Sequence, residues 1–170
     1  DDRAEVIGGR DPRNRLDDVL PFADRDNDGL ADTAEDLDRD GRLDVGETDP
    51  GLADTDRDGL PDGVEVGGRT NPRDADSDDD GLPDGLEDAN HDGILDPDET
   101  DPTNADSDGD GVRDGAEDHD ANGLVDPGEM DPRVADSDGD HLPDGVEDSD
   151  HDGRRDPEET DGALADSDAD

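Results

Sequence analysis

The sequence predicts a mostly irregular fold, an extended rod of tandem loops with almost no regular helix or strand. Three observations lead to this prediction. Hydrophobic residues make up only 24% of the 170 residues, with a single aromatic residue, Phe22. Acidic residues number 60 against 14 basic ones, which gives a formal charge of -46. Finally, Asp, Gly and Pro recur at fixed intervals, whereas an ordinary acidic surface would scatter its charges.

The composition also limits what the chain can do. So few apolar residues cannot build a sizeable core, and alone they are typical of a disordered polyanion. The chain has no cysteine, which excludes disulfides and thiolate metal sites. The negative charge argues against nucleic acid as a partner, and no apolar run approaches the roughly 20 residues of a membrane span. Because we find neither a signal-peptide pattern nor an initiator Met, we expect a mature segment or a piece of something longer.

Internal repetition sets the domain organisation. Each unit opens with an Ala-Asp pair, whose alanines are Ala23, Ala53, Ala75, Ala105, Ala135 and Ala165. The predicted parts are a partial loop and linker at 1–22, units at 23–52, 53–74, 75–104, 105–134 and 135–164, and the start of a sixth unit at 165–170. The unit at 53–74 contains one loop and the other complete units contain two. Repetition of units of 22 to 30 residues indicates an array in which each unit contacts mainly its neighbours.

The unit at 75–104 shows how a loop is built. Its first loop places Asp76, Asp78, Asp80, Asp84 and Glu87 at positions one, three, five, nine and twelve, with a glycine at position six. This is the spacing of an EF-hand-type loop, in which alternate side chains and the carbonyl of position seven surround a hard cation that takes about six to eight oxygen ligands. The sequence therefore predicts Ca²⁺ as the cofactor, at about nine or more ions.

Nine complete loops follow this spacing, and each offers five side chains and one position-seven carbonyl. The predicted ligands of the first loops, including the single loop at 54–65, are Asp24, Asp26, Asp28, Leu30, Asp32, Glu35, Asp54, Asp56, Asp58, Leu60, Asp62, Glu65, Asp76, Asp78, Asp80, Leu82, Asp84, Glu87, Asp106, Asp108, Asp110, Val112, Asp114, Glu117, Asp136, Asp138, Asp140, Leu142, Asp144 and Glu147. Those of the second loops are Asp36, Asp38, Asp40, Arg42, Asp44, Glu47, Asp88, Asn90, Asp92, Ile94, Asp96, Glu99, Asp118, Asp120, Asn122, Leu124, Asp126, Glu129, Asp148, Asp150, Asp152, Arg154, Asp156 and Glu159. Candidate partial sites at the two ends use Asp2, Glu5, Asp166, Asp168 and Asp170.

Regular elements should be short. The closing Glu87 is followed at once by Asp88 of the next loop, and Pro recurs along the chain, which excludes the long helices of a true EF-hand. We expect at most one helical turn at 84–87 and its equivalents, capped by Asp84. Residues 15–20 are candidates for one or two further turns. Strands are poor candidates because Asp, Gly and Pro are depleted in sheets.

Metal binding and folding should be a single event. The loop carboxylates repel one another, and the recurring aliphatic residues bury too little surface to offset that repulsion and the entropy of ordering the loops. Only a bound cation reverses the sign of the charge term. Two alternative interpretations need no metal site: an acidic disordered linker, or the acidic surface of a halophilic protein. Neither explains the loop spacing.

The four histidines occupy loop positions that are not expected to bind the ion. We expect His91, His119 and His151 to face solvent. His141 replaces the turn glycine, so we expect a positive φ and a strained or weaker site there. Arg154 and Arg155 place positive charge in the last loop, where they either pair with a neighbouring chain or offset the acid excess.

Residues 54–87, DTDRDGLPDGVEVGGRTNPRDADSDDDGLPDGLE, closely resemble the bacterial thrombospondin type 3 repeat, and the resemblance covers about 23–170. It implies calcium-dependent loops wound around a string of ions, with almost no regular secondary structure, in secreted or surface-attached proteins. The chain differs from the animal members in lacking their cysteines, so their disulfide-braced path is not implied.

These observations predict a calcium-binding extracellular structural module, a calcium-rigidified spacer, stalk or fibre shaft. Sites of about 0.1 to 1 mM affinity suit an extracellular or cell-surface location. Alternatives are an adhesion or interaction module that binds a partner through its anionic face, and a calcium buffer or mineral-nucleating polyanion. Expected partners besides calcium are neighbouring copies, joined head to tail or in a fibre, and cell-surface proteins or glycans. We expect that the chain has no enzymatic activity, because no Ser-His-Asp order, phosphate loop or H-E-x-x-H motif occurs in the sequence.

Overall fold

The computed structural model describes residues 23–165, and within this range the chain is almost entirely irregular. Its regular elements are the helices α1 (Asp32–Glu35), α2 (Asp62–Gly67), α3 (Asp84–Glu87), α4 (Asp114–Glu117) and α5 (Asp144–Glu147). Between residues 23 and 165 there is no strand, only one isolated bridge between Pro127 and Glu129. The predicted fold class is therefore confirmed. The predicted turns at 15–20 and the partial sites at both ends lie outside the described residues.

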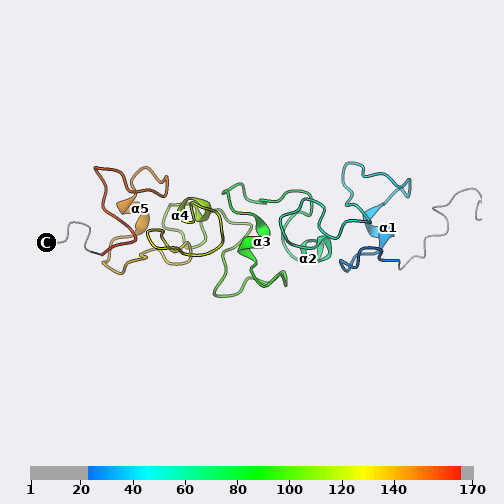
Figure 1. Cartoon of the computed structure of the whole chain (residues 1–170), viewed down its shortest axis with the longest axis horizontal. Helices are drawn as coiled ribbons and strands as arrows, with labels where there is room; N and C mark the ends of the chain where they lie inside the picture. Colours follow the sequence, from blue (N-terminus) through cyan, green and yellow to red (C-terminus); the bar gives the residue numbers. More distant parts are fainter. Residues whose placement is uncertain (1–22, 166–170) are drawn as a thin grey trace, which may run out of the picture.

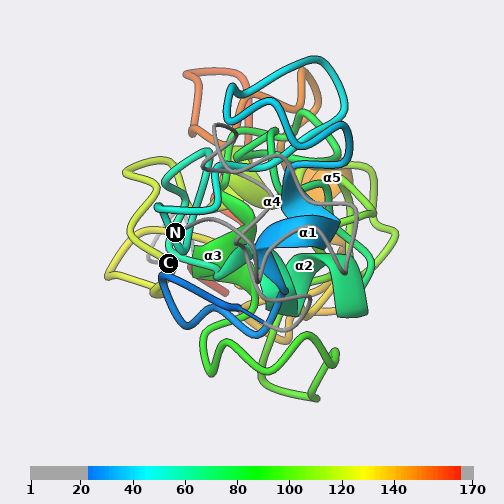
Figure 2. The ribbon, with the colours of Figure 1, turned by 90° about the vertical axis from the view of Figure 1, so that its right-hand side faces the viewer.

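The predicted units follow one another in a row. Helices α1 to α5 succeed one another in sequence order along the longest axis of the molecule (Figure 1). Seen along that axis, the helices lie near the centre and the loops project around them (Figure 2). None of the helices between residues 23 and 165 has the length and apolar character needed to cross a bilayer.

Each helix occupies the same place in its unit, from position nine of the first loop. Four of them end at position twelve, as expected, because the next loop begins there. Helix α2 is longer, at six residues, since no second loop follows Glu65 and the helix continues through Gly67. The predicted cap at Asp84 is wrong. Pro83 is the N-cap, with no side-chain cap bond, and Asp84 instead accepts hydrogen bonds from the backbone N–H and hydroxyl of Ser77.

Consecutive units touch through glycine. Position ten of the first loops is glycine in the second to fifth units, namely Gly63, Gly85, Gly115 and Gly145. A Cβ on Gly63 would lie 2.2 Å from the carbonyl oxygen of Asp28, and one on Gly85 would lie 2.6 Å from that of Asp58. Backbone therefore packs directly on backbone at each junction, and a side chain at this position would separate the units.

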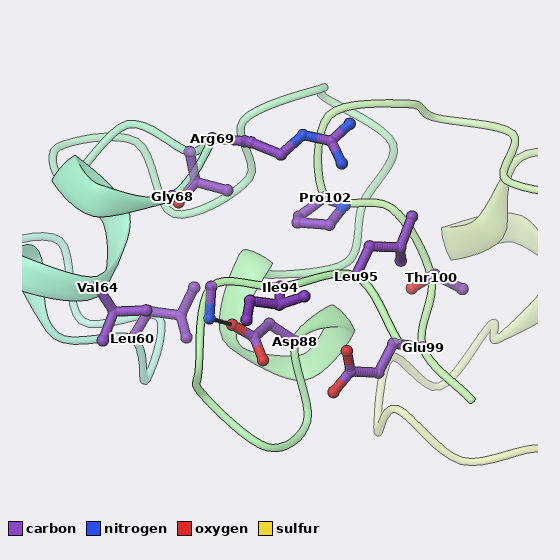
Figure 3. A pocket seen from close by; sticks show the side chains of 12 residues that line it. Leu60, Val64, Gly68, Arg69, Asp88, Ile94, Leu95, Glu99, Thr100 and Pro102 are labelled. Atoms are coloured by element: carbon purple, nitrogen blue, oxygen red, sulfur yellow. Dashed lines mark hydrogen bonds between the residues drawn. The ribbon is translucent and has the colours of Figure 1, made fainter. Parts of the chain in front are cut away.

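A small apolar contact reinforces each of the central junctions. The buried hydrophobic residues at position seven are Leu60, Leu82 and Val112. Leu60 and Val64 line one pocket with Ile94 and Leu95 of the next unit (Figure 3). A second pocket likewise joins Leu82 to the second loop of the unit that follows it. The second loop of the following unit thus helps to cover Leu60 and Leu82.

Leu82→Ala should lower the free energy of unfolding by about 2 to 5 kcal/mol, because the change leaves a cavity at a residue only 2% exposed. Urea unfolding in saturating calcium measures the effect. The matched control is Leu37→Ala, at a leucine 65% exposed, which should change the stability by less than about 0.5 kcal/mol. Equal effects of the two substitutions would contradict the assignment of this contact.

Candidate metal centres

Two backbone hydrogen bonds recur in all nine loops and hold the carboxylates in place. The aspartate at position one accepts the N–H of position six, at distances from 2.6 Å in Gly123→Asp118 to 3.3 Å in Gly29→Asp24. The side chain at position five accepts the N–H of position seven, as in Leu82→Asp80 at 2.7 Å. These bonds turn the chain back on itself, so that side chains from alternate positions converge.

The same turns require left-handed backbone at two positions of every loop. Position six has a positive φ throughout, and His141 adopts it at φ 84°, as expected for its replacement of the glycine. Position four is left-handed as well, which the sequence analysis missed. Its residues are Asn27, Arg39, Arg57, Asp79, His91, Gly109, Ala121, Gly139 and His151. The frequent Asn, Asp, His and Gly at this position were the available signal, since these types tolerate positive φ best.

Ala121→Gly should stabilise the protein by about 1 kcal/mol, because Ala121 holds φ at 52° and a Cβ is unfavourable in that region. Thermal or urea unfolding in saturating calcium measures it. Ala34→Gly is the matched control, because Ala34 is an exposed residue of helix α1, where the same exchange should destabilise by about 0.5 to 1 kcal/mol. A destabilising Ala121→Gly would rule out strain at this position.

Several carboxylate oxygens of the first loops are buried without hydrogen-bond donors. The closing glutamates are buried, and Glu35 is only 1% exposed. Side-chain oxygens with no hydrogen-bond partner in these loops belong to Asp26, Asp28, Glu35, Asp56, Glu65, Asp78, Glu87, Asp108, Asp114, Glu117, Asp138 and Glu147. Burying an ionised oxygen without a partner costs several kcal/mol, on the order of 2 to 7 even for a neutral polar group. A divalent cation would satisfy these oxygens, and the donor set, which is entirely oxygen, fits such an ion.

In the second loops, backbone N–H groups donate hydrogen bonds to the carboxylate of the closing glutamate. Their closing glutamate accepts backbone N–H groups of its own loop, as Glu47 does from Leu37 at 2.7 Å and from Asp44 at 3.1 Å. The N–H of position nine donates to the closing glutamate in all four second loops, at 2.9 to 3.1 Å. None of the unpartnered buried oxygens belongs to these loops. The spacing assigns the same ligand positions to all nine loops, whereas the structure divides the loops into two kinds.

Oxygens from several predicted ligands lie within 4.8 Å of one another. In the first loops the group Asp24, Asp26 and Asp28 is one case, and Asp54, Asp56 and Asp58 is another. In the second loops, Asp38 takes part in two groups, with Asp36 and Glu47 and with Asp40 and Asp44. A further group, Asp28, Glu35 and Asp62, joins two consecutive units. These carboxylate groups are able to hold metal ions.

Position nine does not behave alike in the two kinds of loop. In the first loops its aspartate is buried and accepts the N–H of position two of the same loop, as in Thr55→Asp62 at 2.7 Å. The first loops therefore bind their position-nine carboxylate to backbone and leave their closing glutamate without backbone donors. In the second loops the closing glutamate takes the backbone donors.

The electrostatic environment of the closing glutamates opposes ionisation. Burial, followed by repulsion from neighbouring carboxylates, raises the pKa of Glu65 and of Glu87 to about 9. The same two causes raise the pKa of Glu117 to about 10. Such groups either hold a proton at neutral pH or require a cation beside them. Protons and metal ions should therefore compete for the same oxygens.

The histidines make local contacts and are exposed, as expected. The Nε2 atoms of His91 and His151 lie 3.1 and 3.0 Å from the carbonyl oxygens of Gly85 and Gly145 in the preceding first loops. His119 differs, because its Nδ1 lies 3.3 Å from Oε1 of the predicted ligand Glu129.

No protein-family model, curated protein or solved structure matches the chain.

In the presence of a chelator, the chain should be compact at low pH and expanded at high pH. The folded-state pKa values of Glu87 and Glu117, about 9 and 10, lie above the ordinary value of 4.5. The folded state therefore binds more protons than the unfolded state. The stability that these protonated glutamates contribute is fully present below pH 4.5 and is lost as the pH rises through their folded-state pKa values. Small-angle X-ray scattering with chelator at pH 4 and pH 9 tests this.

Two variants separate the buried glutamate from the general loss of charge. Glu117→Gln is neutral at every pH and should extend the compact state to higher pH. Glu158→Gln removes the same charge at an exposed glutamate and should leave the transition in place. If both variants shift the transition equally, burial at Glu117 is not its cause.

Proposed function

We propose that this chain is a calcium-binding structural module that calcium converts into a stiff spacer, stalk or fibre shaft of an extracellular or cell-surface protein. The observation that carries the proposal is the repetition, along the rod, of buried carboxylate oxygens without donors in every first loop. The resemblance to the bacterial thrombospondin type 3 repeat supports the same function.

The donor set favours calcium over other common ions. Each loop offers carboxylates, one backbone carbonyl at position seven and no sulfur or expected imidazole ligand. Calcium accepts about six to eight oxygens in flexible geometry, whereas magnesium requires a tight octahedron and retains much of its water. The left-handed turns at positions four and six wrap the chain closely enough to supply several oxygens from one loop.

The packing of the units favours a spacer. Four junctions have the glycine contact, and those on either side of the unit at 75–104 add an apolar contact; both kinds of contact connect a unit to the next one along the row. Nine divalent ions would carry +18 and leave -28 of the formal -46. The residual repulsion favours an extended over a folded-back rod. A calcium buffer would need the loops but not this repeated contact between units.

Calcium should convert the chain from an expanded coil into a rod of defined length. At pH 9, small-angle X-ray scattering at low-millimolar calcium should give a rod profile, and chelator should give a coil profile with rapid proteolysis, because the ionised carboxylates repel one another without the ion. Magnesium at the same concentration should restore the rod only weakly.

Each outcome of this experiment has a distinct meaning. A chain with the same profile and the same protease resistance in calcium and in chelator at pH 9 would contradict the proposal. Calcium uptake without a defined shape would favour the alternative function as a calcium buffer.

A variant tests the predicted ligands. Asp58→Asn, Asp80→Asn and Asp110→Asn together remove one ligand charge from each of three central first loops, so this protein should need more calcium for the transition. The control is Asp98→Asn, at an exposed carboxylate outside the predicted ligand set, which should need less calcium than the triple variant.

A further inference from the structure

We propose that consecutive units also share cation sites, each formed by positions five and twelve of one first loop and position nine of the next. The first is Asp28, Glu35 and Asp62, and the equivalent residues are Asp58, Glu65 and Asp84, then Asp80, Glu87 and Asp114, then Asp110, Glu117 and Asp144. The inference builds on the proposed function, because it adds sites between loops to the sites within them.

The geometry of the first junction carries the proposal. One carboxylate oxygen from each of Asp28, Glu35 and Asp62 lies within 4.8 Å of the other two. Glu35 and Asp62 are 1% and 0% exposed, so this is a buried cluster. Oε2 of Glu35 and Oδ2 of Asp28 have no hydrogen-bond partner. Asp62 accepts two hydrogen bonds from Thr55, but these neutral donors do not balance its charge. Three carboxylates so close together, two of them buried and two with an unpartnered oxygen, need a positive charge between them.

The same arrangement recurs along the rod. Asp84, Asp114 and Asp144 lie close enough to Glu65, Glu87 and Glu117, respectively, to repel their carboxylates. Glu87 and Glu117 each have two unpartnered side-chain oxygens, Glu65 has one, and Asp114 of the next unit has one. The recurrence follows the unit boundary, since the position-nine carboxylate always comes from the following unit.

The junction glycine explains how the carboxylates of two units come so close. Gly63 directly follows Asp62 and lies on the carbonyl of Asp28, where a Cβ would be 2.2 Å from the oxygen. Gly85 follows Asp84 in the same way, and its N–H donates to Oδ2 of Asp58 at 3.1 Å. Without the glycine, the next unit could not bring its position-nine carboxylate into this group.

These sites differ from those within the loops. The group Asp24, Asp26 and Asp28 lies within one loop, whereas the shared group takes Asp28 and Glu35 with Asp62. Asp28 and Glu35 each have two carboxylate oxygens, which allows one carboxylate to contact two cations. Four shared ions would carry +8 and reduce the residual charge from -28 to -20 of the formal -46. Because each shared site needs two ordered units, calcium binding should be cooperative along the rod.

Counting bound calcium in the full chain tests the proposal without altering any carboxylate. Native mass spectrometry at saturating calcium should find four fewer ions in the variant that combines Gly63→Ala, Gly85→Ala, Gly115→Ala and Gly145→Ala than in the unmodified chain. Gly63→Ala alone should lose one ion. Gly67→Ala is the matched control, because it lies in the same helix with no atom within 4 Å of its added Cβ, and it should lose none.

A second variant keeps the test decisive if the fourfold change prevents ordering. Asp62→Asn removes one shared carboxylate and retains an oxygen for the N–H of Thr55. It should lose one ion, and combining it with Gly63→Ala should lose no more than one. Losses that add to two would place Asp62 in its own loop's site and overturn the inference.

The remaining outcomes separate this inference from the proposed function. If Gly63→Ala and the unmodified chain bind equal numbers of ions and both form the calcium-dependent rod, the shared sites are absent and the spacer function stands. If the unmodified chain binds no calcium, the proposed function fails and the shared sites fail with it.

Discussion

Repulsion among buried carboxylates is the constraint on which the rest of the structure depends. The closing glutamates of the first loops lie in the interior of a chain that has few apolar residues to stabilise it, and each has at least one oxygen without a donor. Unpartnered anions in such surroundings make the ordered chain unstable unless a cation or protons compensate them. The one-turn helices, the loop turns and the unit contacts all order the chain around these groups, so charge compensation and folding are linked.

Within a loop, the backbone provides the geometry and the side chains provide the charge. N–H groups donate to the carboxylates at positions one and five, while left-handed residues at positions four and six bring the chain round. The two kinds of loop use the same turns and differ in which carboxylate the backbone binds. In the first loops backbone N–H groups bind position nine, and in the second loops they bind position twelve. The first loops thus leave their buried closing glutamate without backbone donors.

Between loops, glycine contacts and a few aliphatic side chains organise the rod. Leu60 and Leu82 are buried where the second loop of the following unit packs against them, while Leu142, at the same position in the last complete unit, is 43% exposed. Each unit is thus completed by its neighbour, which is the arrangement expected of a linear repeat array. This arrangement suits the proposed spacer, since order established in one unit supports order in the next.

The sequence by itself determined the irregular fold and the one-turn helices, because these depend on the spacing of Asp, Gly and Pro within about twelve residues. It did not determine the N-cap of α3, where Pro83 and not Asp84 takes the position, because Ser77 binds the carboxylate of Asp84. Only the tertiary structure divided the loops into two kinds and brought Asp62 to Asp28 and Glu35. These features depend on contacts between units, and a pattern of spacings within one loop contains no information about which atoms of the next loop lie against it.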